Sequence, residues 1–367
     1  MSHAAGAGQS RQAVYPGLVD ARLALVMLAV VSGCRGETVG EAPGDGGAGG
    51  SGGVDAGGYE WTLVYDDAEA TAGSALHSIW GASADFVVAV GTDRQIVQFE
   101  GGEWSRLTKT AGAHLFGVWG RSSVDVAAVG LYSFAGKPAI FYRATQGWVV
   151  GGPFPDDMPI VTDVWGVGTQ KYFTAQAGRI YQDDPINKPN QRYHLAVITG
   201  GCPEGNTTSP QLNGIDGTGL DNVLVVGDDA LLAHRDDTGW ARFCALTPEV
   251  HYSAVTAIPG STDFYVGSNF LGLVRWRGRG EVMTQIHEDR ATPGADESYL
   301  HGLWAASAAL VIGVGDGGRV LVYEGTKDGA REIPSPTTES LYGVWGADEA
   351  TVYVTGKGSR IWRLRLP

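Results

Sequence analysis

The chain has 367 residues, of which 56 are Gly and 43% are hydrophobic. It can bury a large core but is poorly suited to long helices, because each Gly in a helix costs up to ~1 kcal/mol relative to Ala. The net charge of −14 and the isoelectric point of about 4.9 argue against nucleic acid as a partner, since phosphate binding needs a basic surface.

The N-terminal segment has the features of a secretion signal. An apolar run over residues 23–32 follows Arg11 and Arg22. It is too short to span a bilayer, which takes ~20 residues, but it fits the apolar region of a signal peptide. The run ends in Val31-Ser32-Gly33-Cys34, which resembles the lipobox of bacterial lipoproteins. That resemblance implies a signal peptide over residues 1–34 and a lipid on Cys34; the alternative is a buried apolar strand with an incidental Cys.

Residues 35–58 predict a flexible tether. The segment is dominated by Gly and contains neither an aromatic residue nor an apolar periodicity, which is typical of a mobile linker. Its r.m.s. span should be roughly 27 Å. A lipid at one end of such a tether would hold a globular domain just off a membrane.

From residue 59 onward one phrase recurs seven times. An apolar residue, two variable residues and a β-branched residue or Leu are followed by Trp-Gly, a polar turn and an apolar strand ending in Val-Gly. The copies begin at Leu76, Leu115, Val161, Leu212, Tyr252, Leu300 and Leu341. In the fourth copy Asp216 replaces Trp, and the fifth copy is the most degenerate. We interpret the repeated Trp as a packing residue between structural repeats.

Each repeat has room for four short strands. Alternating segments follow each Val-Gly, and several copies continue into a fourth segment opened by Trp. Residues 59–367 divided by seven give about 44 residues per repeat, the length of a propeller blade. The chain ends after the third strand of the seventh repeat, and Tyr59–Tyr65 has the pattern of an orphan fourth strand. We therefore predict an all-β, seven-bladed β-propeller over residues 59–367, closed by its N-terminal strand.

These Trp-Gly and Val-Gly repeats resemble those of the secreted seven-bladed propeller lipoproteins of Gram-negative bacteria. They resemble WD40 and kelch domains in architecture only. The resemblance implies a lipid-anchored protein of the bacterial cell envelope, on the periplasmic or the surface side of the outer membrane. The resemblance implies a fold and a cellular location, and it leaves the activity open.

The second position of each repeat suggests a ligand site. This position begins the innermost strand, on the face of the propeller that carries the fourth-to-first-strand connections, here called the channel face. It is large in four contiguous blades (His301, Tyr342, His77 and Phe116) and small in the others. We add four loop residues to this candidate site, namely Tyr132, Phe134, Asn269 and Phe270. The alternative is that the larger side chains fill gaps between unequal blades.

No hydrolase, nucleotide-binding or calcium-loop motif is present in the sequence. We therefore predict a monomeric, non-enzymatic binding or scaffold module without metal or cofactor, which recognises an envelope protein or a glycan. The alternative is a polysaccharide hydrolase or lyase, which requires paired carboxylates at the channel mouth. The acids available for that role are Asp316, Asp228, Asp163 and Glu60.

The remaining cysteines, Cys202 and Cys244, predict a disulfide bond. With Cys34 occupied by lipid they form an even pair in an oxidising compartment. Cys202 lies in the long loop that enters blade four, and Cys244 lies late in the fourth strand of the same blade.

Overall fold

The computed structural model describes residues 58–108, 112–133, 135–145, 147–183, 193–196, 198–199, 210–244, 250–269, 271–278, 283–287 and 299–367. The predicted signal peptide, nearly all of the tether, and Cys34 lie outside these residues. In the part that is described, no helix is long and apolar enough to cross a membrane.

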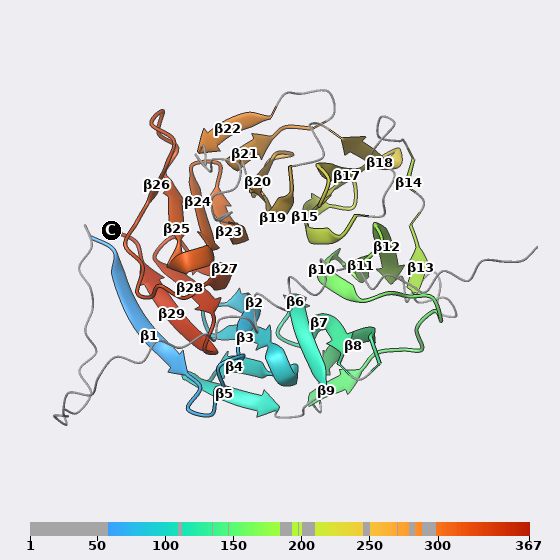
Figure 1. The fold of residues 1–367 in the computed structure, drawn as a ribbon, viewed down its shortest axis with the longest axis horizontal. Helices are drawn as coiled ribbons and strands as arrows, with labels where there is room; N and C mark the ends of the chain where they lie inside the picture. The colour runs from blue at the N-terminus through green and yellow to red at the C-terminus, as the bar shows by residue number, and fades with distance from the viewer. Residues whose placement is uncertain are drawn as a thin grey trace, which may run out of the picture. The chain divides into compact units, whose positions relative to one another are not determined.

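The described strands form seven sheets, each built on four antiparallel strands, which are the blades of a propeller (Figure 1). Blades one and two contain β2 (Leu76–Ser83), β3 (Phe86–Gly91), β4 (Ile96–Glu100), β5 (Glu103–Thr108), β6 (Ala113–Ser122), β7 (Asp125–Tyr132), β8 (Lys137–Ala144) and β9 (Gly147–Val150). Blades three and four contain β10 (Val161–Val167), β11 (Gln170–Ala175), β12 (Arg179–Asp183), β13 (Tyr193–Leu195), β15 (Leu212–Gly219), β16 (Asn222–Gly227), β17 (Leu231–Asp236) and β18 (Gly239–Cys244).

The last three blades complete the ring. They contain β19 (Tyr252–Ala257), β20 (Phe264–Ser268), β21 (Gly272–Trp276), β22 (Thr284–His287), β23 (Leu300–Ser307), β24 (Leu310–Gly315), β25 (Val320–Tyr323), β26 (Ala330–Glu332), β27 (Leu341–Asp348), β28 (Thr351–Gly356) and β29 (Arg360–Arg365). The first strand of every blade contacts the first strands of both neighbours, so β2, β6, β10, β15, β19, β23 and β27 surround one axis (Figure 1). The all-β, seven-bladed prediction is confirmed.

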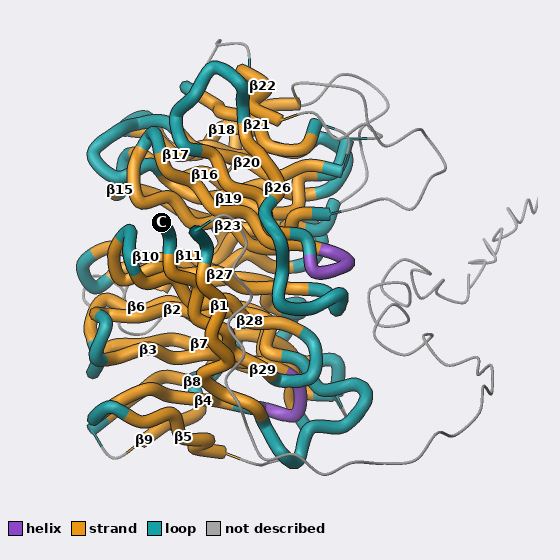
Figure 2. The backbone as a smooth tube through the Cα atoms, turned by 90° about the vertical axis from the view of Figure 1, so that its left-hand side faces the viewer, coloured by secondary structure: helices purple, strands orange, loops and turns teal. Residues whose placement is uncertain are grey.

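The hydrophobic core lies between adjacent blades, whose strands are coloured orange in Figure 2. Seven apolar clusters are present, and each is built mainly from two adjacent blades. Continuously apolar second strands such as β3, with sequence FVVAVG, are buried along their whole length, because each packs against a blade on either side. Burial on both faces is what an unbroken apolar run of strand length predicts.

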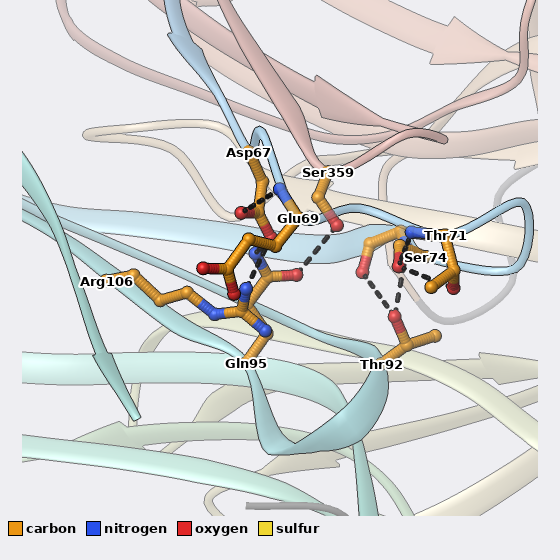
Figure 3. A network of polar contacts seen from close by, with 9 residues as sticks. Asp67, Glu69, Thr71, Ser74, Thr92, Gln95, Arg106 and Ser359 are labelled. Atoms are coloured by element: carbon orange, nitrogen blue, oxygen red, sulfur yellow. Dashed lines mark hydrogen bonds and ion pairs between the residues drawn. The ribbon is translucent and has the colours of Figure 1, made fainter. Parts of the chain in front are cut away.

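The ring closes as predicted. β1 (Glu60–Asp66) pairs antiparallel with β29, which makes the N-terminal strand the fourth strand of blade seven. A polar network then ties β1 to blade one (Figure 3): Asp67 accepts hydrogen bonds from Arg106 (2.6 Å) and Gln95 (3.0 Å). Ser359 of blade seven donates to the other end of Gln95 at 2.7 Å. Both chain ends are thereby joined to blade one.

Blade four departs from the prediction. Its sheet has a fifth strand, β14 (Ile198–Thr199), which pairs parallel with β18 at the outer edge. A two-residue strand is too short to show alternation, so only the neighbouring edge of β18 reveals it.

Each repeated Trp packs over the Gly of the following blade, which confirms its role between repeats. A Cβ atom added at Gly346 would lie 2.4 Å from the ring of Trp304, and one at Gly81 would lie 2.4 Å from Trp345. The other three pairs have the same arrangement, with Trp80 against Gly120, Trp119 against Gly166, and Trp165 against Gly217. The two blades that follow a blade without Trp carry Ala257 and Ala305 at the Gly position.

Candidate binding site on the channel face

A β-bulge at the second position shapes the inner end of every blade. In each first strand the pairing register shifts between positions one and three, so the residue at position two has no partner in the second strand. Such bulges re-aim a side chain. The seven residues at the bulges are His77, Phe116, Thr162, Asn213, Ser253, His301 and Tyr342. All of these side chains are partly exposed.

The four large residues predicted to lie together do so. The ring of Tyr342 lies 5.3 Å from those of both His301 and His77, and the ring of His77 lies 5.9 Å from that of Phe116. Tyr299 extends the row because its ring stacks on His301 at 6.4 Å with an interplanar angle of 17°. We call these five residues, Tyr299, His301, Tyr342, His77 and Phe116, the axial arc.

An aspartate orients one end of the axial arc. His301 Nε2 lies 2.8 Å from Asp316 Oδ1, while the Tyr299 amide donates to Asp316 Oδ2 at 3.1 Å. Ser340 Oγ donates to Oδ1 at 3.2 Å. Burial favours the protonated carboxyl group, but the hydrogen bond and charge of His301 together with the Tyr299 amide outweigh burial and lower the pKa of Asp316. Asp316, which lies beside the axial arc, is therefore ionised at neutral pH.

His77, near the middle of the arc, is held neutral. Burial lowers its pKa to about 4, with smaller contributions from His114 and His301. Burial also raises the pKa of Tyr342. Both rings are therefore uncharged at neutral pH, and each offers a hydrogen-bonding atom beside an aromatic face.

Acidic side chains line the axis on the side where the aromatic residues end. Asp163 in β10 accepts hydrogen bonds from the Val164 amide (2.8 Å) and from the Ile215 amide of blade four (3.2 Å). Asp216 in β15 bonds in the same way to the amides of Gly217 and of Ala257 in blade five, both at 2.8 Å. Burial raises the pKa of Asp163 to about 7 and that of Asp216 to about 6.

Tyr132 and Asn269, the two predicted loop residues that the structure describes, do not join the axial arc. The ring of Tyr132 packs on Phe141 at 6.0 Å, against the core between blades one and two. Asn269 is fully buried, and its side-chain oxygen accepts a hydrogen bond from the His251 amide at 2.9 Å. Asn269 therefore supports a loop from inside the protein. Phe134 and Phe270 lie outside the described residues.

The four acids proposed for the enzyme alternative lie in separate environments. Asp316 pairs with His301, and Asp228 accepts a hydrogen bond from Asn213 at 3.0 Å. Asp163 holds the neighbouring blade. Glu60 is exposed on β1, an outermost strand. Among the described residues, no three His, Cys, Asp or Glu side chains come close enough together to hold a metal ion.

A cleft of about 460 Å³ lies elsewhere on the channel face, at the seam between blades seven and one. Its charged lining is internally paired: Lys357 contacts Glu339 at 2.7 Å and Arg360 contacts Asp66 at 3.1 Å. Because these charged side chains already pair with one another, the cleft offers little to a charged ligand. We therefore place the candidate site at the axial arc.

Sequence reasoning missed Tyr299 and the role of Asp216. Tyr299 immediately precedes the phrase, at a position where the other copies share no pattern. Asp216 was recognised in the sequence only as a replacement for Trp. The next blade carries Ala257 where a Gly usually lies under the Trp ring. This paired change indicates that the two positions are in contact, and the structure shows that Asp216 binds the Ala257 amide.

The sequence matches no protein family and no curated protein. Solved structures do match. The structure titled "YCF48 bound to D1 peptide" aligns with a TM-score of 0.61 and 10% identity, over 86% of this chain and 99% of that one. The WD40 β-propeller domain of Doa1 gives a TM-score of 0.61 and 9% identity, over 84% and 97%.

A catalytically inactive variant of virginiamycin B lyase from Staphylococcus aureus, solved with quinupristin, gives a TM-score of 0.65 and 13% identity, over 84% and 100%. At these identities the likeness shows the propeller architecture alone.

Proposed function

We propose that this chain is a lipid-anchored, non-enzymatic binding module of the bacterial cell envelope, which recognises a protein or a glycan through the axial arc. The Val-Ser-Gly-Cys sequence and the Gly-rich tether support the anchor. One observation carries the binding site: seven equivalent bulges present side chains to the axis, and the large ones form a continuous row in adjacent blades. Rigid strands hold this row, which favours recognition.

A protein ligand has additional support. One structurally similar propeller was solved with a bound peptide, so this architecture can bind a peptide. One of the similar structures is a lyase, which supports the enzymatic alternative. The distribution of the acids weighs against a glycosidase, since its two carboxyl groups must flank one bond, whereas Glu60 and Asp163 occupy an outermost and an innermost strand.

Site-specific photo-crosslinking in the producing cells tests this function. A photoreactive phenylalanine at position 116 places the probe in the axial arc; the control position, Val124, is exposed in the β6–β7 turn on the opposite face. We expect a discrete adduct from position 116 only, reduced about tenfold by His77→Ala with His301→Ala, a change equivalent to ~1.4 kcal/mol. Protease and glycosidase digestion identify the adduct as protein or glycan.

Equal crosslinking from positions 116 and 124 would contradict the proposal. So would an adduct from position 116 that the double variant leaves unchanged, provided that the variant retains the wild-type melting temperature.

A further inference from the structure

The charged side chains in the middle of the seven first strands carry one sign. The seven first strands contain no Lys, and their single Arg, Arg121, lies at the end of β6 on the opposite face, paired with Asp125 at 3.2 Å. Asp348 lies at the same end of β27. Within the middle of these strands the charged residues are Asp163 and Asp216. The field along the axis is therefore negative at neutral pH and attracts cations.

The acidic side chains begin where the aromatic row ends. A Cβ atom added at Gly117 would lie 2.5 Å from Asp163 Oδ1, so this carboxyl group rests against the residue that follows Phe116. Asp216 lies one blade further on. Going round the axis, the aromatic rings of blades six, seven, one and two are thus followed by the acids of blades three and four.

Both acids retain the capacity to receive a ligand. Each carboxylate oxygen offers two acceptor sites; backbone amides use one on each oxygen, and the Thr256 side chain uses a further one on Asp216. As whole residues both are partly exposed, although burial dominates the surroundings of each carboxyl group. Burial raises the pKa of each carboxyl group, which means that the ionised forms lack compensating positive charge in the free protein. A bound cation would supply it.

The aromatic residues of the arc suit the same kind of ligand. The faces of Phe and Tyr rings attract ammonium and guanidinium groups through their quadrupoles. Asp316, held ionised beside His301, adds a third carboxylate at the other end of the row.

We propose that the ligand of the axial arc is an extended segment of a protein that presents a Lys or Arg side chain, which lies over the aromatic rings and directs its cation toward Asp163 and Asp216. This inference rests on the proposed function and adds the chemical class of the ligand. A neutral glycan would gain no charge–charge attraction from the acidic side of the axis, and an acidic segment would be repelled by it.

Three capped nonapeptides test the inference on the full-length chain. They consist of Gly and Ser with one central Lys, Gln or Glu, and binding is measured by saturation-transfer NMR. We expect the Lys peptide to bind roughly tenfold more tightly than the Gln peptide, and the Glu peptide to bind most weakly. Asp163→Asn with Asp216→Asn should remove the preference for Lys.

The matched control is Asp236→Asn with Asp237→Asn, which likewise removes two carboxyl groups, here from the β17–β18 turn on the opposite face. It should leave the preference intact. Equal effects of the two double variants would overturn the inference, because they would show attraction by net charge alone.

Equal binding of the wild-type chain to the Lys and Gln peptides, or no binding of the Lys peptide, would also overturn it. That comparison needs no variant, so it decides even if Asp163→Asn with Asp216→Asn fails to fold. Crosslinking from position 116 reports separately on the proposed function and would stand with a neutral ligand.

Discussion

The substitution Gly346→Ala should destabilise the propeller by creating a clash between blades. The new methyl group would lie 2.4 Å from two ring atoms of Trp304, well inside van der Waals contact. Gly346 has no positive φ, so the cost is steric and has no contribution from backbone strain. Overpacking of this kind costs about 1–3 kcal/mol. At this chain length that corresponds to a fall in melting temperature of several degrees.

A second substitution should relieve the clash. Blade five has Thr256 at the Trp position, and blade six then carries Ala305 in place of Gly. Combining Trp304→Thr with Gly346→Ala reproduces that natural pairing between blades six and seven. Trp304→Thr alone should cost about 2 kcal/mol, because the ring is only partly buried. The double variant should be more stable than the sum of the single effects by about 1–2 kcal/mol.

Calorimetric melting of the four proteins measures this coupling. Gly73→Ala is the control, because a Cβ atom there would meet no atom within 4 Å; it should change stability by less than about 0.5 kcal/mol. The proposed packing of Trp304 against Gly346 would be refuted if the Gly346→Ala protein were as stable as the wild type. Strictly additive effects of the two substitutions would refute it as well.

Three further predictions concern the chain ends and the cysteines. Deleting residues 1–64 should expose the edge of β29 and promote aggregation; a truncated protein that stays monomeric with an unchanged melting temperature would rule out this closure. Cys34→Ser should move the protein from the membrane to the soluble fraction, whereas persistent membrane binding at unchanged mass would exclude the lipid. Cys202, and the side chain of Cys244, lie outside the described structure, and their disulfide should stabilise the fold by roughly 4 kcal/mol. Titration of the denatured, unreduced protein should find neither thiol free.

The fold could be predicted because the blades pack against their neighbours through the same residue types at the same positions. A ring of seven sheets needs a small residue wherever the Trp of the previous blade lies. The pair Trp-Gly therefore recurs along the sequence. The bulge also leaves a trace. Leu76 and Ile79 are both buried although they are three residues apart, a spacing that regular alternation forbids and one extra residue explains.

The site could be predicted only in part. Position two was recognisable because it recurs, and comparing its seven residues identified the large ones. Asn269 looked like a loop residue near that site, but burial and its bond to the His251 amide are properties of one loop in three dimensions. Asp163 was considered only as a catalytic acid, because the Ile215 amide that it holds lies 52 positions away in the chain.

The pH dependence of stability should reveal two opposing groups near the axis. The pKa of Asp163 is raised to about 7 in the folded protein from an ordinary 3.8, and that of Asp216 to about 6. Between the ordinary pKa and the raised one, the folded state binds more protons than the unfolded state. The contribution of the two aspartates to stability therefore falls as pH rises from about 4 to about 7. His77 acts in the opposite direction. Its folded pKa of about 4 lies below the ordinary 6.5, so stability is lost as pH falls through this window, in which only the unfolded chain takes up the proton.

Melting temperatures measured between about pH 4 and pH 7 separate the two contributions. Removing the acids with Asp163→Asn and Asp216→Asn leaves His77 unopposed, so this variant should lose stability on acidification relative to the wild type. His77→Gln leaves the acids unopposed and should gain stability on acidification. Each titrating group contributes at most about 1.4 kcal/mol per pH unit, and all other groups of the chain are common to the three proteins. The slopes should therefore diverge in opposite directions from the wild-type slope, and parallel slopes would show that neither burial shifts a pKa in the folded protein.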